Sequence, residues 1–292
     1  MYEREKMNIL QLNYFIKVVE TKNITKAAES LYISQPSLSQ TIKSLENELN
    51  VKLFKKDRKG ISLTPEGQIF QKYAYSILKN ISDAKKELAD FSNNQSTITL
   101  SVKAATSMIP DIINKFKIIN PEINVVISQQ DINDTMSDSD LFVYSSTSKI
   151  NQNNGFTLLT EDCFVGMSPL NPLANVDTIS PEMLTNEKFI TMPGNLPLNL
   201  LTHELCQHSG FSPNIILEVD NKDLIFSLVS INMGITLVPI KTWSPFIKDH
   251  NIILKKLNTK CVRYINLQWK NDRYISKNAE LMKSFLNDFF KL

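Results

Sequence analysis

The spacing of apolar residues divides the chain into three regions. Between residues 25 and 49, Leu38, Ile42, Leu45 and Leu49 recur at steps of four, three and four, which places them on one stripe of a helix. From 65 to 91 a similar spacing persists without interruption, and beyond 96 short apolar runs alternate with helical patterns. The pattern predicts a helical head, one long helix and an α/β body.

The helix with the first stripe has a polar opposite face. That face carries Pro36, Gln40, Lys43 and Asn47, and Ser34 is placed to cap the helix. A short helix of small residues precedes it, with room only for a sharp turn between the two. Two such helices form the helix-turn-helix plan for reading the major groove. An ordinary helical hairpin with a solvated polar face fits the periodicity about equally well.

The segment after this helix, LFKKDRKGISLTPEG, is strongly basic around a turn at Lys59-Gly60 and predicts a basic hairpin, or wing. It favours DNA binding over a plain hairpin, since lysine and arginine neutralise phosphates. Gln can pair with adenine edges, Ser with several bases and Lys with guanine. The expected base-reading set is Gln35, Ser37, Gln40 and Lys43, the expected phosphate-facing set is Ser34, Lys55, Lys56 and Arg58, and Pro36 belongs to the same DNA-binding surface.

Residues 7–67 resemble the DNA-binding half of a LysR-type transcriptional regulator. The match runs from MNILQLNYFIKVVE through ITKAAESLYISQPSLSQTIKSLENELNVKLF to ISLTPEG. Gln40 departs from the family, which most often has Arg there. The resemblance implies a sequence-specific regulator that acts as a homodimer or tetramer on a dyad-symmetric site in double-stranded DNA. It also implies a small-molecule effector and RNA polymerase as partners.

Composition adds a charge division to this plan. The chain has 292 residues, 42% of them hydrophobic, which suits about two domains. Residues 1–95 hold 15 Lys and Arg against 11 Asp and Glu, whereas the remainder holds 17 against 19. A basic head on a mildly acidic body fits one module that meets phosphates and one that does not. Without an apolar run of about 18 residues or a signal-peptide core, we expect a cytoplasmic protein with no membrane partner.

The long helix is expected from Pro65 to Phe91, with Thr64 as its cap. Its apolar residues hold a heptad register, which is typical of a coiled coil. An amphipathic helix packed on its own domain is the alternative, but LysR-type proteins dimerise through a linker helix here. The expected dimer contacts are Phe70, Ile77, Ile81 and Leu88.

The body after residue 96 begins with a strand, helix and strand that predict a parallel βαβ unit. The resemblance continues in two segments of the body, NPLANVDTISPEML and LVSINMGITLVP. Asn171 in the first stands where the family often has His, and Asn232 in the second stands where it often has Gly. A third segment, DINDTMSDSD, is shorter than the helix that the family usually has at that place. The resemblance implies two lobes, as in periplasmic binding proteins. The expected division is a winged helix-turn-helix at 1–64, a linker helix and polar hinge at 65–95, and an effector domain at 96–292, with lobe 1 at about 96–160 and 267–292 and lobe 2 at about 161–266.

Two strand-to-helix junctions are the candidate ligand site. In open α/β sheets, ligands bind beyond the carboxyl ends of strands, and helix N-termini there favour anions. The resemblance implies that the two junctions face one another across an effector cleft, which suits a small metabolite, with a carboxylate as one option. Two ordinary capped turns, with Asn195 capping the second helix, are the alternative. The expected effector-binding residues are Lys103, Ala105, Thr106, Ser107, Met192, Gly194 and Asn195.

Other chemistry finds little support. Cysteines 163, 206 and 261 are widely spaced and odd in number, which fits reduced thiols. Cys206 lies where the peroxide-sensing branch of the family has one of two cysteines, but the partner position holds Leu196, so we expect an inert thiol. His203 and His208 would lie about 140° apart on a helix, which excludes a shared metal.

A glycine-rich phosphate loop and a nucleophile elbow are both missing from the sequence, so neither catalysis nor a cofactor is expected. The competing function is a solute-binding or metabolite-sensing protein without sequence-specific DNA binding.

Overall fold

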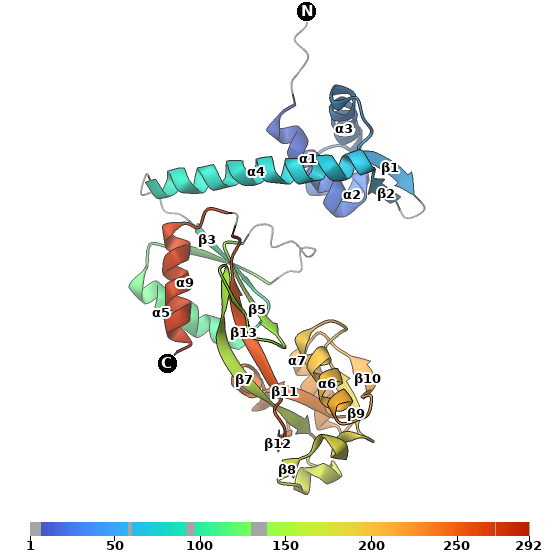
Figure 1. Ribbon diagram of the computed structural model, residues 1–292, viewed down its shortest axis with the longest axis vertical. Coiled ribbons are helices and arrows are strands. Elements are labelled where there is room, and N and C mark those ends of the chain that lie inside the picture. Colours follow the sequence, from blue (N-terminus) through green and yellow to red (C-terminus); the bar gives the residue numbers. More distant parts are fainter. Residues whose placement is uncertain (1–6, 58–59, 92–96, 130–138, 272, 292) are drawn as a thin grey trace, which may run out of the picture. The chain divides into compact units, whose positions relative to one another are not determined.

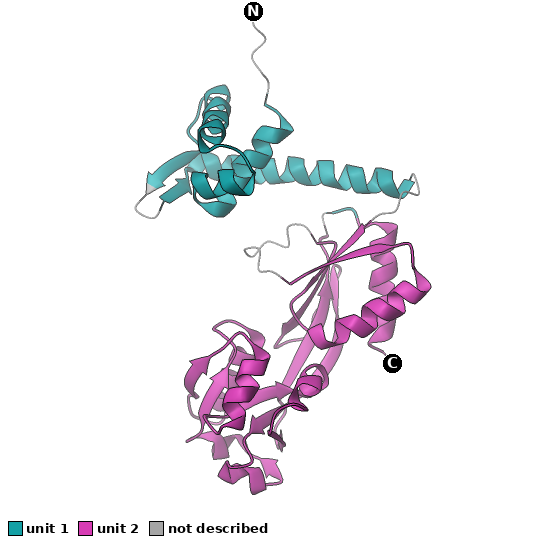
Figure 2. Ribbon diagram, turned by 180° about the vertical axis from the view of Figure 1, so that it is seen from behind, with its two compact units in different colours: residues 1–94, 132–134, 272–274 teal, residues 95–131, 135–271, 275–292 magenta. Residues whose placement is uncertain are grey.

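The computed structural model describes residues 7–57, 60–91, 97–129, 139–271 and 273–291. The chain forms two compact units (Figure 2). The first holds α1 to α4 with β1 and β2, and the second holds the elements from β3 to α9. The expected DNA contact Arg58, the expected hinge at 92–96 and the stretch 131–138 lie outside the described residues.

The first unit consists of helices and one antiparallel hairpin. Ser34 accepts a hydrogen bond from the Ser37 amide and caps α3, and Thr64 accepts one from Gly67 at the start of α4, both as expected. The elements are α1 (Ile9–Thr21), α2 (Ile24–Ser30), α3 (Gln35–Leu49), β1 (Phe54–Asp57), β2 (Gly60–Leu63) and α4 (Pro65–Phe91).

The apolar stripe of α3 forms the core of this unit. Leu38 and Leu45 are fully buried, together with Phe15 from α1. The Phe15 ring contacts Phe54 of the hairpin at 5.2 Å and Phe70 of α4 at 4.9 Å between centroids. One aromatic residue therefore joins the first helix, the hairpin and the start of the long helix.

The second unit is built on one continuous sheet in the order β4-β3-β5-β13-β7-β12-β8, with β6 and β11 paired to β7. β9 and β10 form a separate parallel pair. The strands are β3 (Thr97–Val102), β4 (Asn124–Ser128), β5 (Leu141–Ser146), β6 (Asn151–Gln152), β7 (Gly155–Met167), β8 (Thr178–Ile179), β9 (Lys188–Thr191), β10 (Asn214–Glu218), β11 (Thr236–Pro239), β12 (Ile253–Leu257) and β13 (Val262–Gln268).

Helices cover this sheet in two groups (Figure 1). The α5 and α9 helices lie together, with Phe116 and Phe285 in edge contact, whereas α6 and α7 lie near β9 and β10. The helices are α5 (Ile109–Ile119), α6 (Pro197–His208), α7 (Lys222–Ser230), α8 (Ile240–Ile247) and α9 (Lys277–Phe289), with 3-10 turns η1 (Thr106–Met108), η2 (Pro172–Asn175) and η3 (Pro181–Leu184).

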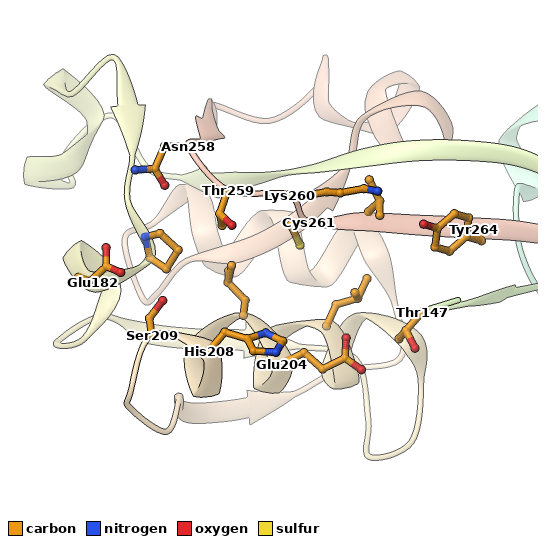
Figure 3. Close-up of a pocket in the computed structure, with 14 residues that line it drawn as sticks. Thr147, Glu182, Glu204, His208, Ser209, Asn258, Thr259, Lys260, Cys261 and Tyr264 are labelled. Atoms are coloured by element: carbon orange, nitrogen blue, oxygen red, sulfur yellow. The ribbon is translucent and has the colours of Figure 1, made fainter. Parts of the chain in front are cut away.

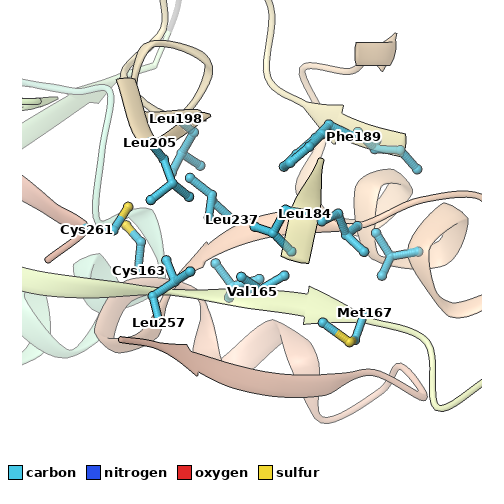
Figure 4. Packing of buried hydrophobic residues seen from close by; sticks show 14 of the residues in the cluster. Cys163, Val165, Met167, Leu184, Phe189, Leu198, Leu205, Leu237, Leu257 and Cys261 are labelled. Atoms are coloured by element: carbon cyan, nitrogen blue, oxygen red, sulfur yellow. The ribbon is translucent and has the colours of Figure 1, made fainter. Parts of the chain in front are cut away.

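Two separate apolar cores divide the second unit into lobes. One core contains Phe116 and Leu158, and the other contains Val165 and Phe226 (Figure 4). Strand β7 contributes residues to both cores, and β13 pairs with it in antiparallel orientation. These two paired strands therefore join the lobes. The βαβ start is also present, because β3 pairs in parallel with both β4 and β5.

Candidate functional site

The N-terminal half of α3 presents a polar surface to solvent. The apolar stripe of this helix is buried in the domain core. On the exposed face, the side-chain amide of Gln35 donates to the Ser39 hydroxyl at 2.8 Å. The exposed side chains can therefore reach base edges, while the buried stripe fixes the helix on the rest of the domain. The exposed residues here are Ser34, Gln35, Pro36, Ser37, Gln40 and Lys43.

The hairpin β1-β2 is tied to α3 by one buried carboxylate. Glu46, 7% exposed, accepts hydrogen bonds from the amides of Leu53 at 2.9 Å and Phe54 at 3.3 Å, and from Lys52 Nζ at 2.6 Å. Lys55 and Lys56 are exposed on β1. Because Glu46 belongs to α3, it fixes where the basic hairpin begins relative to the exposed face of that helix. The sequence reasoning missed this role for Glu46.

Glycine is required where α4 leaves the hairpin. A Cβ on Gly67 would lie 2.1 Å from the Leu53 carbonyl oxygen, far inside van der Waals contact. The Thr64 hydroxyl caps the helix from the same turn and donates to the Lys52 carbonyl at 2.6 Å. The LTPEG run therefore encodes a close crossing of backbone segments as well as a helix start.

An apolar stripe on α4 is exposed along most of the helix. Phe70 is turned toward its own domain, against Phe15, whereas Ile77 is 38% exposed and Leu88 69% exposed. Ile69 and Tyr73 are also exposed, each one position before a residue that packs on the domain core, Phe70 and the buried Ala74. The exposed stripe thus begins at Ile69 and Tyr73 and joins the predicted seam at Ile77.

A cleft of about 210 Å³ lies between the lobes of the second unit. Four of the expected effector-binding residues line it: Lys103, Ala105 and Thr106 from the junction after β3, and Met192 after β9. Ala105 has φ 56°, a left-handed conformation that turns the chain sharply after the strand. The two junctions are therefore brought together around one cavity.

The other three expected residues do not line the cleft. The Ser107 hydroxyl donates to the Thr242 carbonyl at 2.6 Å, and the Gly194 amide donates to Glu218. Asn195 is exposed, and its expected capping role is wrong, because the N-cap of α6 is Leu196 without a side-chain bond. A leucine side chain has no acceptor, and Asn199 instead fixes this loop by donating to the Met192 carbonyl at 3.0 Å.

Arg263, which lines the cleft, belongs to a buried ion pair. Arg263 on β13 donates to Glu161 Oε1 from Nε at 3.1 Å and from Nη2 at 2.8 Å. Glu161 on β7 also accepts from the amides of Lys241 and Thr242 and from the Thr242 hydroxyl. Glu161 is 1% exposed and Arg263 4%. These hydrogen bonds compensate the burial of both charges at the point where the connecting strands cross between lobes.

Lys222, the first residue of α7, also lines the cleft, beside the cations Lys103 and Arg263. Its Nζ donates to the Thr106 hydroxyl at 3.0 Å, from lobe 2 to lobe 1, and lies 3.8 Å from the Phe246 ring centroid. Burial lowers the pKa of Lys222 below its ordinary value. The sequence analysis missed Lys222, Glu161 and Arg263, although charged residues inside apolar strand runs at 161 and 263 were a usable signal.

A larger cavity of about 490 Å³ lies between α6 and the turn from β12 to β13 (Figure 3). Glu204 and His208 of α6 face Thr259 and Lys260 across it. Tyr264 lines this cavity, whereas its neighbour Arg263 lines the cleft, as alternating side chains of one strand require. The two cavities therefore lie on opposite faces of β13.

The three cysteines are buried in the core of lobe 2. Cys163 on β7 lies beside Cys261, the residue before β13 (Figure 4), and the backbone amide of Cys163 donates to the Cys261 carbonyl at 2.8 Å. A hydrogen bond to Cys261 and burial raise the pKa of Cys163 well above its usual value, and burial raises the pKa of Cys206 to about 11. Such thiols remain protonated near neutral pH and are poor nucleophiles.

Within the described ranges, His, Cys, Asp and Glu side chains form no group of three suited to holding a metal ion. The helices in those ranges are also too short or too polar to cross a membrane.

Comparison with known proteins agrees with both units. Residues 9–68 match the bacterial regulatory helix-turn-helix proteins of the lysR family, and residues 92–291 match the LysR substrate binding domain. The HTH-type transcriptional regulator YybE of Bacillus subtilis is 28% identical over 96% of this chain and 98% of its own. The transcriptional dual regulator GltC of the same organism is 27% identical over 97% and 98%.

Solved structures share the fold over nearly the whole chain. A full-length OxyR variant from Pseudomonas aeruginosa has a TM-score of 0.66 at 19% identity, covering 99% of this chain and 96% of its own. HinK, a LysR family regulator from Pseudomonas aeruginosa, has a TM-score of 0.60 at 20% identity, covering 98% and 100%. The helix-turn-helix match favours a DNA-binding regulator over a solute-binding protein. Together with the exposed α3 face and the cleft between two α/β lobes, these matches show that the chain belongs to the LysR family of DNA-binding, effector-responsive transcriptional regulators.

Proposed function

We propose that two copies of this chain read a dyad-symmetric DNA site with their α3 helices, and that a small molecule in the cleft between the lobes changes how well they do so. The observation that carries the DNA-reading part is the exposed polar half of α3 above a buried apolar stripe. Exposed Lys55 and Lys56 on the adjoining hairpin add phosphate contacts. RNA polymerase is the expected further partner.

Gln40 is the residue that we expect to contribute most to base selection. It is exposed on α3, and its side-chain amide can pair with an adenine edge. Gln40→Ala should weaken the preferred site by about 1–3 kcal/mol and leave binding to random DNA almost unchanged. The measurement is a titration of both DNAs with the full-length chain, after selection of the preferred sequence from a random pool.

Two matched variants separate base reading from charge and folding. Asn47→Ala changes an exposed amide on the C-terminal half of the same helix and should leave both affinities unchanged. Lys56→Ala removes an exposed cation from the hairpin and should lower both affinities together, with a flatter dependence on salt. An equal loss on both DNAs for Gln40→Ala would contradict its role in base reading.

The dimer part of the proposal is supported by the exposed apolar stripe of α4. In a dimer this stripe would pack against the same helix of a second copy and bury Ile69, Tyr73, Ile77, Leu88 and the already half-buried Ile81. Such a pairing would set the spacing between the two α3 helices, which a dyad-symmetric site requires. Phe70, on the other side of α4, would hold this helix against its own domain through the contact with Phe15.

The effector part of the proposal is supported by the cleft itself. Residues of both lobes line it, so a bound molecule would contact both and favour one angle between them. A metabolite that stabilises the chain and alters its DNA affinity should lose both effects with Thr106→Val, because that change removes a hydroxyl from the lobe 1 wall. A metabolite that retains both effects on this variant would bind outside the cleft.

A further inference from the structure

We propose that Lys222 is the residue that selects an anionic effector, with the ligand carboxylate held between the Lys222 ammonium of lobe 2 and the Thr106 hydroxyl of lobe 1. This inference rests on the proposed role of the cleft as the effector site and names the chemistry of that site. It assigns the anion to a residue outside the two junctions that the sequence indicated.

The three cations that line the cleft differ in their partners. Arg263 makes two hydrogen bonds to Glu161, so its charge is compensated within the protein. Lys103 donates to the Gln129 carbonyl at 3.3 Å. Lys222 has a neutral hydroxyl and an aromatic ring as its contacts, and among the described residues no carboxylate oxygen forms an ion pair with it. Lys222 is therefore the cation best suited to a ligand anion.

The surroundings of Lys222 make this lack of compensation significant. Its side chain is partly buried, and the desolvation lowers its pKa. The nearby Asp223 opposes this shift and Arg263 adds to it, and Asp220, the carboxylate that lines the cleft, is exposed. A partly desolvated ammonium gains more from a carboxylate than an exposed one does, because the ion pair is less screened.

Thr106 can serve the same anion from the other lobe. Its hydroxyl accepts a hydrogen bond from Lys222 and still has a proton to donate. A carboxylate placed beside both groups would accept from Lys222 and from Thr106 at once, so the anion would replace a neutral contact between the lobes by a charge-assisted one. The cleft volume of about 210 Å³ is below the roughly 300–1,000 Å³ of typical ligand pockets, which suits a small organic acid.

The test uses acetate as the smallest carboxylate probe and acetamide as its uncharged match, at equal ionic strength, on the full-length chain. Lysine side chains carry a ¹³C label, and the Lys222 signal is assigned by its loss in Lys222→Arg. Acetate should raise the pKa of Lys222 toward its ordinary value, because an anion favours the charged form. Acetamide should leave that pKa unchanged, and the Lys103 signal should respond less than the Lys222 signal.

Variants test the same contact without relying on the pKa. Acetate should shift the backbone amide signal of Thr106 in the wild type, and Lys222→Met should weaken the acetate affinity about tenfold, as expected when a charged hydrogen bond is lost. Lys222→Arg should retain part of the affinity, and Lys103→Met should retain most of it. An equal Lys222 pKa in acetate and acetamide, or an undiminished acetate affinity in Lys222→Met, would overturn the proposal.

DNA binding provides the separate test of the proposed function. If acetate binds at Lys222 but no cleft ligand alters the affinity for the selected DNA site, the anion site stands and the regulatory role of the cleft fails. If a cleft ligand alters DNA affinity equally in the wild type and in Lys222→Met, the regulatory role stands and the assignment of Lys222 fails.

Discussion

Replacing Glu161 by glutamine should destabilise the second unit strongly, although the two side chains have nearly the same shape. Glu161 is 1% exposed and accepts from Arg263, Thr242 and the Lys241 amide. Glutamine removes the negative charge and presents an NH₂ group where one carboxylate oxygen accepted hydrogen bonds. Arg263 would then be a buried cation without a counter-charge, which costs about 3–5 kcal/mol. This is a large fraction of the roughly 5–15 kcal/mol that stabilises a typical domain.

Tryptophan fluorescence can follow this unit alone. The chain has two tryptophans, Trp243 and Trp269, and both belong to the second unit. Trp243 also lies beside the altered pair, with Arg263 5.9 Å from its ring centroid. In urea, a loss of about 3 kcal/mol at a slope of about 3 kcal/mol per M moves the midpoint by about 1 M.

A double variant controls for the loss of charge. In Glu161→Met with Arg263→Met, both ions are replaced by apolar side chains, so no unpaired charge remains buried. This variant should be more stable than Glu161→Gln, even though it changes two residues. The reasoning is refuted if Glu161→Gln unfolds within about 0.5 kcal/mol of the wild type, or if the double variant is the less stable of the two.

Three further outcomes follow from burial and exposure. Ile77→Asp combined with Ile81→Asp should prevent dimer formation, because it buries unpaired charges in the proposed seam; a dimer by light scattering would contradict this. Gly67→Ala should destabilise the first unit by roughly 1–3 kcal/mol through its clash with the Leu53 carbonyl, and an unchanged melting temperature by circular dichroism would exclude that clash. Cys206, with a pKa of about 11, should react with a thiol reagent at pH 8 only after the chain unfolds. In the native chain its reactivity should rise only as the pH approaches 11. Rapid labelling of the native chain at pH 8 would contradict its burial.

The sequence predicted elements best where a local signal marks their limits. The helix from Pro65 to Phe91 has a threonine cap, a proline in its first turn and a long apolar register, and its observed bounds agree. β12 was not predicted, because Ile253–Leu257 reads ILKKL, with two adjacent lysines that interrupt both periodicities. Its place is set by pairing with β7 and β8, which is a tertiary effect.

The cleft was predictable only in part, for a similar reason. Thr106 and Met192 follow predicted strands, so the rule about strand ends located them. Lys222 reaches the cleft because α7 packs on the core of lobe 2 and its first residue then lies at the cleft. No local sequence pattern distinguishes it from a solvated lysine at a helix start. Glu161 and Arg263 are 102 residues apart, and their contact depends on the register between β7 and β13.

The pairing of β7 with β13 restricts how the two lobes can move. Two separate connections could slide past one another, whereas two strands bonded into a ribbon keep their register, so the lobes can move only by bending or twisting that ribbon. Pairing passes from Ile265–Leu159 to Asn266–Thr157, which leaves Leu158 as the extra residue of a bulge, and bulges bend a strand. The ribbon therefore bends most easily near this bulge. A ligand at the proposed cleft site would act on the bend of one ribbon in each subunit, and an oligomer could read that bend as a two-way signal.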